Sequence, residues 1–310
     1  MLIGDIPREA LARRLRSDGV HLVTGAFTIH VRASLSRFVD DFAEMYEHYP
    51  FEDPAGIDDA GVRVSAHSLI GRFITAKAKA EVNGEITFGP VPLHRAFTTF
   101  ETAMNWSVAM SDVAPMFLHA AVLERDGLAM LMPADTGSGK STLSAALSWR
   151  GWRLLSDEMA IFSFADGSMR PNPRPVSLKN NAIGVIAAFE PRATISRVYS
   201  GTPKGDIAYM KAPVEAVARF QEGAIPRWVV APCYVAGAPA RVVALDRAEG
   251  FQLLTDNAVN YSSMLQTGFE LLTGVVERCG IYRLTYSNLD EAIGLLDRLH
   301  DGSDGAGSSA

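Results

Sequence analysis

Hydrophobic positions in the first 110 residues predict short helices and strands in mixed order. Between 34 and 48, hydrophobic side chains recur every three or four residues, which predicts an amphipathic helix. A stretch rich in Pro, Asp and Gly from Pro50 to Gly61 indicates a loop. Further helices are expected over 7–17 and 94–111, and strands over 21–33, 61–69 and 79–89, with Asn83-Gly84 as a hairpin turn. Residues 1–110 are therefore predicted to form a smaller α+β domain of unknown role.

From Pro115 the hydrophobic runs lengthen and alternate with helical segments. Two hydrophobic runs, 116–124 and 128–134, flank Arg125-Asp126-Gly127 and predict a β-hairpin. After the hairpin we expect a helix up to Gly151, a strand over 152–167 and a Pro-rich loop over 170–179. Later in the chain we expect strands over 240–247 and 281–287 and a helix over 257–278. Asn288 and Glu291 are expected to cap the start of a last helix. This order predicts an α/β domain over 111–300, a boundary near 112–115, and a disordered tail over 301–310.

Composition and charge fit a globular protein of two domains and exclude several classes. The chain has 310 residues, 48% of them hydrophobic, and 29 Lys and Arg against 35 Asp and Glu, a net charge of −6. This balance gives no electrostatic footprint for nucleic acid. The uncharged stretch 228–240 is too short to cross a bilayer, and the N-terminus has no leader pattern, so we expect a cytoplasmic protein without a membrane partner. Cys233 and Cys279 are expected to be buried.

One segment carries a recognisable chemistry. Residues 133–142 read PADTGSGKST and match the phosphate-binding loop G-x-x-x-x-G-K-[ST] except at the first position, where Ala134 replaces Gly. In such a loop the backbone N–H groups cradle phosphate oxygens, a lysine adds positive charge, and a hydroxyl binds Mg²⁺. The alternative is a Gly/Ser-rich turn, but a hydrophobic strand before and a helix after favour the loop. The residues expected to bind nucleotide are Asp135, Thr136, Gly137, Ser138, Gly139, Lys140, Ser141 and Thr142.

An acidic pair follows the loop at a spacing that should place it close to the bound phosphates. Asp157 and Glu158 come 17 and 18 residues after Lys140, at the end of the strand that follows the helix. Carboxylates there can hold Mg²⁺ and accept a proton from an attacking hydroxyl. Extra cations over the transferred group would help, and Arg174, Lys179 and Lys204 lie in loops that could supply them.

The order of these features resembles the catalytic domain of the HPr kinase/phosphorylase family, and more narrowly the HPr-kinase-related kinases. Family members present a His, a hairpin, a phosphate-binding loop, a helix and an acidic pair, here His119, 125–127, 137–141 and Asp157-Glu158. The match covers about 45 residues closely. It implies a P-loop domain akin to phosphoenolpyruvate carboxykinase.

The resemblance also implies an activity and roles for residues. ATP and Mg²⁺ would serve to phosphorylate a serine of a small protein or peptide, encoded near the kinase. Asp157 would be the general base, Glu158 would join Ser141 at Mg²⁺, and His119 would position the phosphoryl group with Lys140. A homo-oligomer is compatible with the sequence.

The sequence differs from the family pattern at several positions. Ala120 follows His119 where the family has Gly, and the acidic pair is Asp-Glu where the family has Asp-Asp. The family's Glu-x-Arg-Gly segment does not occur at 173–189, so reverse phosphorolysis is not expected. Two alternatives stay open: a kinase of a small-molecule hydroxyl, and a nucleotide-gated binding protein without transfer, which would not need Asp157.

Overall fold

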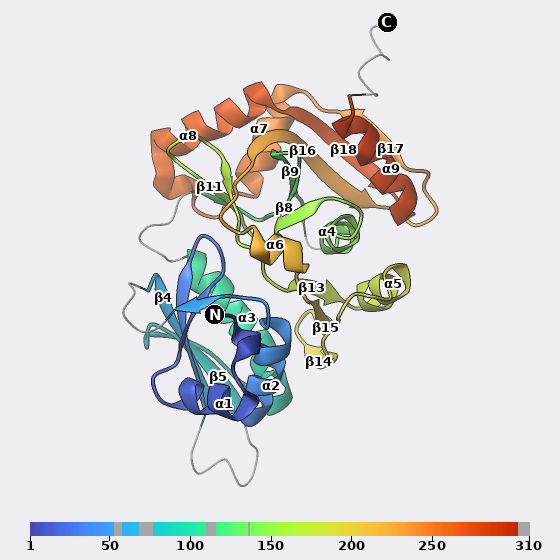
Figure 1. Ribbon diagram of the computed structural model, residues 1–310. Helices are drawn as coiled ribbons and strands as arrows, with labels where there is room; N and C mark the ends of the chain where they lie inside the picture. The colour runs from blue at the N-terminus through green and yellow to red at the C-terminus, as the bar shows by residue number, and fades with distance from the viewer. Residues whose placement is uncertain (53–57, 68–76, 110–115, 136, 303–310) are drawn as a thin grey trace, which may run out of the picture.

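The computed structural model describes residues 1–52, 58–67, 77–109, 116–135 and 137–302. Thr136, the expected boundary at 112–115 and the tail from 303 onward lie outside these ranges. The described residues form a mixed α/β structure with two six-stranded and two three-stranded sheets (Figure 1). None of their helices is long and hydrophobic enough to cross a membrane.

The first six-stranded sheet carries its helices on one side. Its strand order is β3-β1-β2-β4-β5-β6, and only β2 and β4 run parallel. The strands are β1 (Val20–Val23), β2 (Thr28–Ala33), β3 (Phe51–Glu52), β4 (Ala60–Ala66), β5 (Lys77–Val82) and β6 (Ile86–Pro92). The helices are α1 (Arg8–Arg16), α2 (Ser36–Met45) and α3 (Ala96–Ala109). The Asn83-Gly84 hairpin turn is confirmed, because both residues have the positive φ that such a turn needs, 51° and 75°.

The second six-stranded sheet lies between two pairs of helices. Its order is β10-β8-β9-β16-β18-β17. The strands are β8 (Ala120–Arg125), β9 (Leu128–Pro133), β10 (Arg153–Ser156), β16 (Ile225–Tyr234), β17 (Arg241–Ala244) and β18 (Gly280–Tyr286). The helices are α4 (Lys140–Leu147), α7 (Arg247–Asp256), α8 (Tyr261–Arg278) and α9 (Leu289–His300). Leu123 and Met130 share a core with α4 and α9, whereas Val122 and Leu131 face α7 and α8.

Two three-stranded sheets complete the chain. One has the order β12-β11-β7, and the other, β13-β15-β14, lies between the large sheets (Figure 1). Their strands are β7 (Phe117–Leu118), β11 (Ala160–Phe162), β12 (Met169–Arg170), β13 (Val176–Lys179), β14 (Tyr199–Thr202) and β15 (Gly205–Met210), with helices α5 (Asn181–Phe189) and α6 (Val214–Ala218).

Several expectations about local structure are wrong in detail. The strand expected over 152–167 is broken at 157–159, and its halves β10 and β11 join different sheets. The loop expected over 170–179 contains β13, and α7 and β16 were not foreseen. Strand β16 lies between β9 and β18 and runs parallel to both. A parallel strand that is covered on both faces does not show the alternation of hydrophobic and polar residues by which strands are recognised.

The expectation that both cysteines are buried is also wrong. Cys233 is exposed, because it is the second-last residue of β16 and this end of the strand reaches the surface. Cys279 is half-buried, and that burial raises the pKa of its thiol to about 11.

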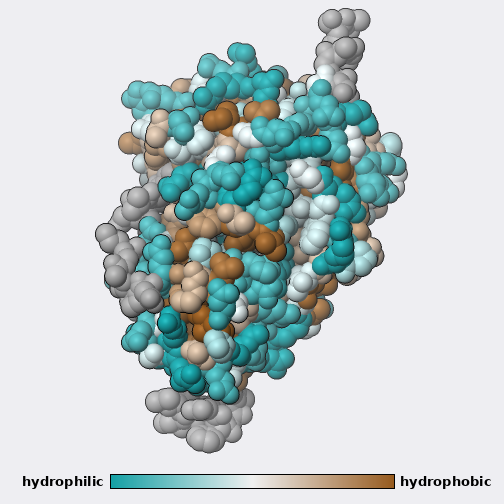
Figure 2. All heavy atoms as spheres, viewed as in Figure 1, coloured by the Kyte–Doolittle hydropathy of each residue, from teal (hydrophilic) through white to brown (hydrophobic). Residues whose placement is uncertain are grey.

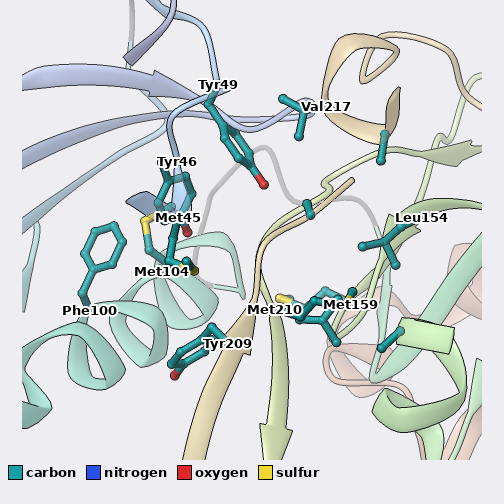
Figure 3. Packing of buried hydrophobic residues seen from close by; sticks show 14 of the residues in the cluster. Met45, Tyr46, Tyr49, Phe100, Met104, Leu154, Met159, Tyr209, Met210 and Val217 are labelled. Atoms are coloured by element: carbon teal, nitrogen blue, oxygen red, sulfur yellow. The ribbon is translucent and has the colours of Figure 1, made fainter. Parts of the chain in front are cut away.

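One hydrophobic core extends from the first sheet into the second. Figure 3 shows Tyr46 and Phe100 at one end of this core and Met159 and Leu154 at the other, with Tyr209 between them. All five side chains are buried. The two sheets are therefore held together by the packing of this core as well as by the chain that connects them.

On the face drawn in Figure 2, hydrophilic residues predominate and hydrophobic residues form limited patches.

A buried ion pair crosses the same junction. The Arg174 guanidinium donates from Nη2 to Glu101 Oε2 at 3.0 Å and to Asn105 Oδ1 at 2.8 Å. Tyr46 donates its hydroxyl to the other Glu101 oxygen at 2.6 Å. Burial raises the pKa of Glu101, and the Arg174 charge opposes that rise. Helix α3 is thus bonded to the segment that leads into β13.

We predict that Arg174→Met destabilises the protein strongly, because it leaves Glu101 buried without its cation. Urea unfolding should show a loss of about 3–5 kcal/mol in the free energy of unfolding. The matched control is Arg13→Met, which breaks the exposed pair with Glu9 and should cost less than about 1 kcal/mol. Similar losses for the two variants would contradict the importance of the buried pair.

Candidate active site

The phosphate-binding segment connects β9 to α4, as its sequence predicts. Gly137 and Gly139 have φ values of 93° and 91°, which favour glycine. A Cβ on Gly139 would lie 2.3 Å from the Tyr286 hydroxyl, and that hydroxyl donates to the Gly139 carbonyl at 3.0 Å. Tyr234 N donates to the Ser138 carbonyl at 2.9 Å. The ends of β16 and β18 therefore support the loop.

A pocket of about 610 Å³ opens above this loop and gathers most of the expected site residues. Of those residues, it is lined by His119, Asp135, Gly137, Ser138, Gly139, Lys140, Ser141, Thr142, Glu158, Lys179 and Lys204. Tyr234, Tyr286, Val185 and Leu289 also line it and were not foreseen. They come from strands and helices far along the chain, and no motif in the sequence marks them. Tyr286 is buried, whereas the exposed surfaces of Tyr234 and Val185 suit a nucleotide base.

Lys140 contacts His119 inside the pocket. Its ammonium nitrogen lies 3.0 Å from His119 Nε2 and 3.4 Å from the Ala134 carbonyl oxygen. His119 Nδ1 lies 3.2 Å from the Glu158 carbonyl oxygen and 3.6 Å from its carboxylate. A neutral imidazole that carries its proton on Nδ1 satisfies these contacts, since Nε2 then accepts from the ammonium group.

The charged groups in the pocket shift one another's pKa values. Burial, followed by the Lys140 charge, lowers the pKa of His119 and keeps its imidazole neutral. Burial lowers the pKa of Lys140, and Asp157 and Glu158 oppose the change. Burial alone would raise the pKa of Glu158, but the charges of Lys179 and Lys140 bring it below its ordinary value. The Lys179 ammonium lies 3.9 Å from Glu158 Oε1. Glu158 is therefore ionised at neutral pH.

Asp157 lies behind the pocket wall. Its residue is 4% exposed, and its Oδ1 accepts from Ser144 Oγ in α4 at 2.6 Å. The same hydroxyl lies 3.2 Å from the Ser141 carbonyl oxygen. Burial and the neighbouring Glu158 raise the pKa of Asp157. Its Oδ2 is buried without a hydrogen-bond partner among the described residues, so this oxygen is left for a ligand.

The oxygen donors beside the loop suit Mg²⁺. Ser141 borders the pocket, and Asp157, whose Oδ2 is orphaned, accepts through its Oδ1 from Ser144 of the same helix, α4. Hydroxyl and carboxylate oxygens are the donors that Mg²⁺ prefers, together with phosphate oxygens and water. Within the described ranges no group of three or more His, Cys, Asp or Glu could hold a metal by itself.

Arg174 does not lie where the sequence analysis placed it. It was expected beside the phosphates, but it lies outside the wall of this pocket and pairs with Glu101. Lys179 and Lys204, expected in the same role, do line the pocket.

We predict that Lys140→Met raises the pKa of His119. Removing the ammonium charge removes the second cause of the depression, so the pKa should move up and burial should hold it below the ordinary value. NMR titration of the imidazole Cε1–H measures the shift. Lys211→Met is the matched control, because Lys211 pairs with Glu47 and should leave His119 unchanged. An equal pKa in wild type and Lys140→Met would contradict the contact.

Comparisons with known proteins find a likeness in structure and none in sequence. No family model matches the sequence, and no curated protein matches it. Among solved structures, the chain is similar to one described as the Hpr(Ser) kinase/phosphatase from Coxiella burnetii, with 15% sequence identity and a TM-score of 0.25. That likeness covers 60% of this chain and 98% of the other. It is a distant structural likeness.

Proposed function

We propose that the protein transfers the γ-phosphoryl group of ATP to a serine hydroxyl of a small protein or peptide. The observation that carries this proposal is the series of contacts from Lys140 to His119 and from His119 to Glu158 in the pocket above the loop. A cation at the phosphates and a carboxylate beside it are the two groups that such a transfer needs. The motif order that resembles HPr kinases supports a serine as acceptor.

Binding of the triphosphate rests on the loop and its lysine. The N–H groups around Gly137 and Gly139 would hold phosphate oxygens, and Lys140 would release His119 to reach the β- and γ-phosphates. Lys179 and Lys204 would add positive charge from the opposite wall. Ser141 and Asp157 would hold Mg²⁺, which when bound neutralises charge on the β- and γ-phosphate oxygens. Tyr234 and Leu289 would contact the base.

We assign the general base to Glu158 and metal binding to Asp157, the reverse of what the family resemblance implies. Glu158 lines the pocket and is ionised, whereas Asp157 is buried against Ser144 of α4. The acceptor oxygen would attack the γ-phosphorus, and its proton would pass to the Glu158 carboxylate. The bond from the γ-phosphorus to the bridging oxygen would break, and ADP would leave with that oxygen.

The two alternatives differ from this proposal in what they require. A kinase of a small molecule would use the same residues with another acceptor. A nucleotide-gated binding protein would need neither a base nor an acceptor, yet Glu158 is held ionised beside Lys140 and Lys179. That placement favours transfer.

We predict that Glu158→Gln abolishes transfer and preserves nucleotide binding. Loss of a general base should lower the rate by about 10²–10⁴-fold, measured with γ-labelled ATP and the proteins encoded by neighbouring genes. Calorimetry with ATP should give an unchanged Kd for Glu158→Gln and a strongly weakened one for Lys140→Met.

The matched control is Asp166→Asn, which neutralises an exposed carboxylate in the turn before β12. Its transfer rate should equal that of wild type. Full transfer by Glu158→Gln would refute the assigned base, and normal ATP binding by Lys140→Met would refute the phosphate site.

A further inference from the structure

A second pocket, of about 350 Å³, adjoins the pocket above the loop. Both are lined by Glu158, Ser177, Lys179, Pro203 and Lys204, so they share one wall. The remaining wall of the second pocket comes largely from β6, α3 and the 3₁₀ turn Leu93–Arg95 between them. A group bound there would lie beside Glu158, on the side of it that faces the first sheet.

The helical side of this pocket presents hydrogen-bond acceptors. Thr98 and Thr99 donate their hydroxyl protons to the Arg95 carbonyl, at 2.8 and 3.1 Å. Thr102 donates to the Thr98 carbonyl at 3.0 Å. A threonine that donates to its own helix keeps its oxygen lone pairs for a partner. Asn105 accepts from Arg174, so its NH₂ group is turned away from that contact and can donate to a ligand.

The charge around the second pocket is positive. Its wall carries Arg95, Arg174, Lys179 and Lys204 against Glu101 and Glu158. Glu101 is paired with Arg174, and Glu158 lies 3.9 Å from Lys179. Arg95 and Lys204 therefore leave an excess of positive charge that suits an anionic ligand.

Hydrophobic side chains close the rest of the pocket. Phe88, Val91 and Ile207 line it, and the Phe88 ring makes an edge contact with exposed Trp106, with 6.1 Å between the ring centroids. A volume of about 350 Å³ lies at the small end of the range for ligand pockets. It accommodates a compact molecule or one or two side chains, and not a folded surface.

We propose that this second pocket is the acceptor site, and that it takes an alcohol with an anionic group beside its hydroxyl. The inference rests on the proposed kinase function and adds the substrate chemistry and a role for the first sheet. The hydroxyl of the acceptor lies against Glu158, and its anionic group lies toward Arg95 and Lys204. Either a free hydroxy acid or a serine next to an acidic residue of a peptide has this chemistry.

The variant that tests the site is Thr102→Met, which extends an exposed helical side chain into the pocket and removes no buried contact. Its matched control is Thr87→Met, an exposed threonine of β6 outside the pocket wall. The full-length proteins are incubated with γ-labelled ATP, Mg²⁺ and an extract of the cells that produce the protein, separated into small-molecule filtrate and retained proteins. Mass spectrometry then identifies the labelled product.

We expect one of the two fractions to be labelled, which identifies the source of the acceptor. Thr102→Met should raise the KM for the acceptor about tenfold or more with the Kd for ATP unchanged, and Thr87→Met should match wild type. The product should carry an anionic group next to the phosphorylated hydroxyl. An unchanged KM in Thr102→Met, or a product without that anionic group, would overturn the acceptor site alone. Absence of labelling by wild type in both fractions would overturn the kinase function itself.

Discussion

The relation between the two large sheets depends on the buried pair of Glu101 and Arg174. Glu101 belongs to α3 on the first sheet, and Arg174 precedes β13 beside the second. A buried carboxylate without its cation is costly, so the pair restricts how α3 can lie against β13. The second pocket lies between these elements and includes both residues in its wall. In the proposed reaction, the position of α3 would thus decide whether an acceptor can reach Glu158.

The proposed chemistry follows from an arrangement of charges that only the fold provides. Lys140 belongs to α4, His119 lies in the bend between β7 and β8, and Glu158 lies in the break between β10 and β11. The acidic pair was expected at the end of a strand, and the break turns its two successive carboxylates in different directions. Asp157 turns toward Ser144, and Glu158 lines both pockets. Two acidic neighbours in sequence therefore have different surroundings and can take different roles.

Much of the fold could be predicted from local patterns, but the junction between sheets could not. The loop before α4 and the hairpin at Asn83 follow from glycine and turn chemistry that acts over a few residues. The cap of α9 is also local, since Asn288 Oδ1 accepts from Glu291 N at 3.1 Å. Arg174 was misplaced because its partner lies 73 residues away. No local pattern distinguishes a cation at a phosphate site from one in a buried pair.

A crystal structure with Mg²⁺ and a non-hydrolysable ATP analogue tests the central claim most directly. We predict the γ-phosphate beside Lys140 and His119, Mg²⁺ on Ser141 and Asp157, and the Glu158 carboxylate facing the second pocket. The base of the nucleotide should lie against the exposed Tyr234 ring. A γ-phosphate remote from Glu158, or Mg²⁺ bound by Glu158 with Asp157 free of it, would contradict the account.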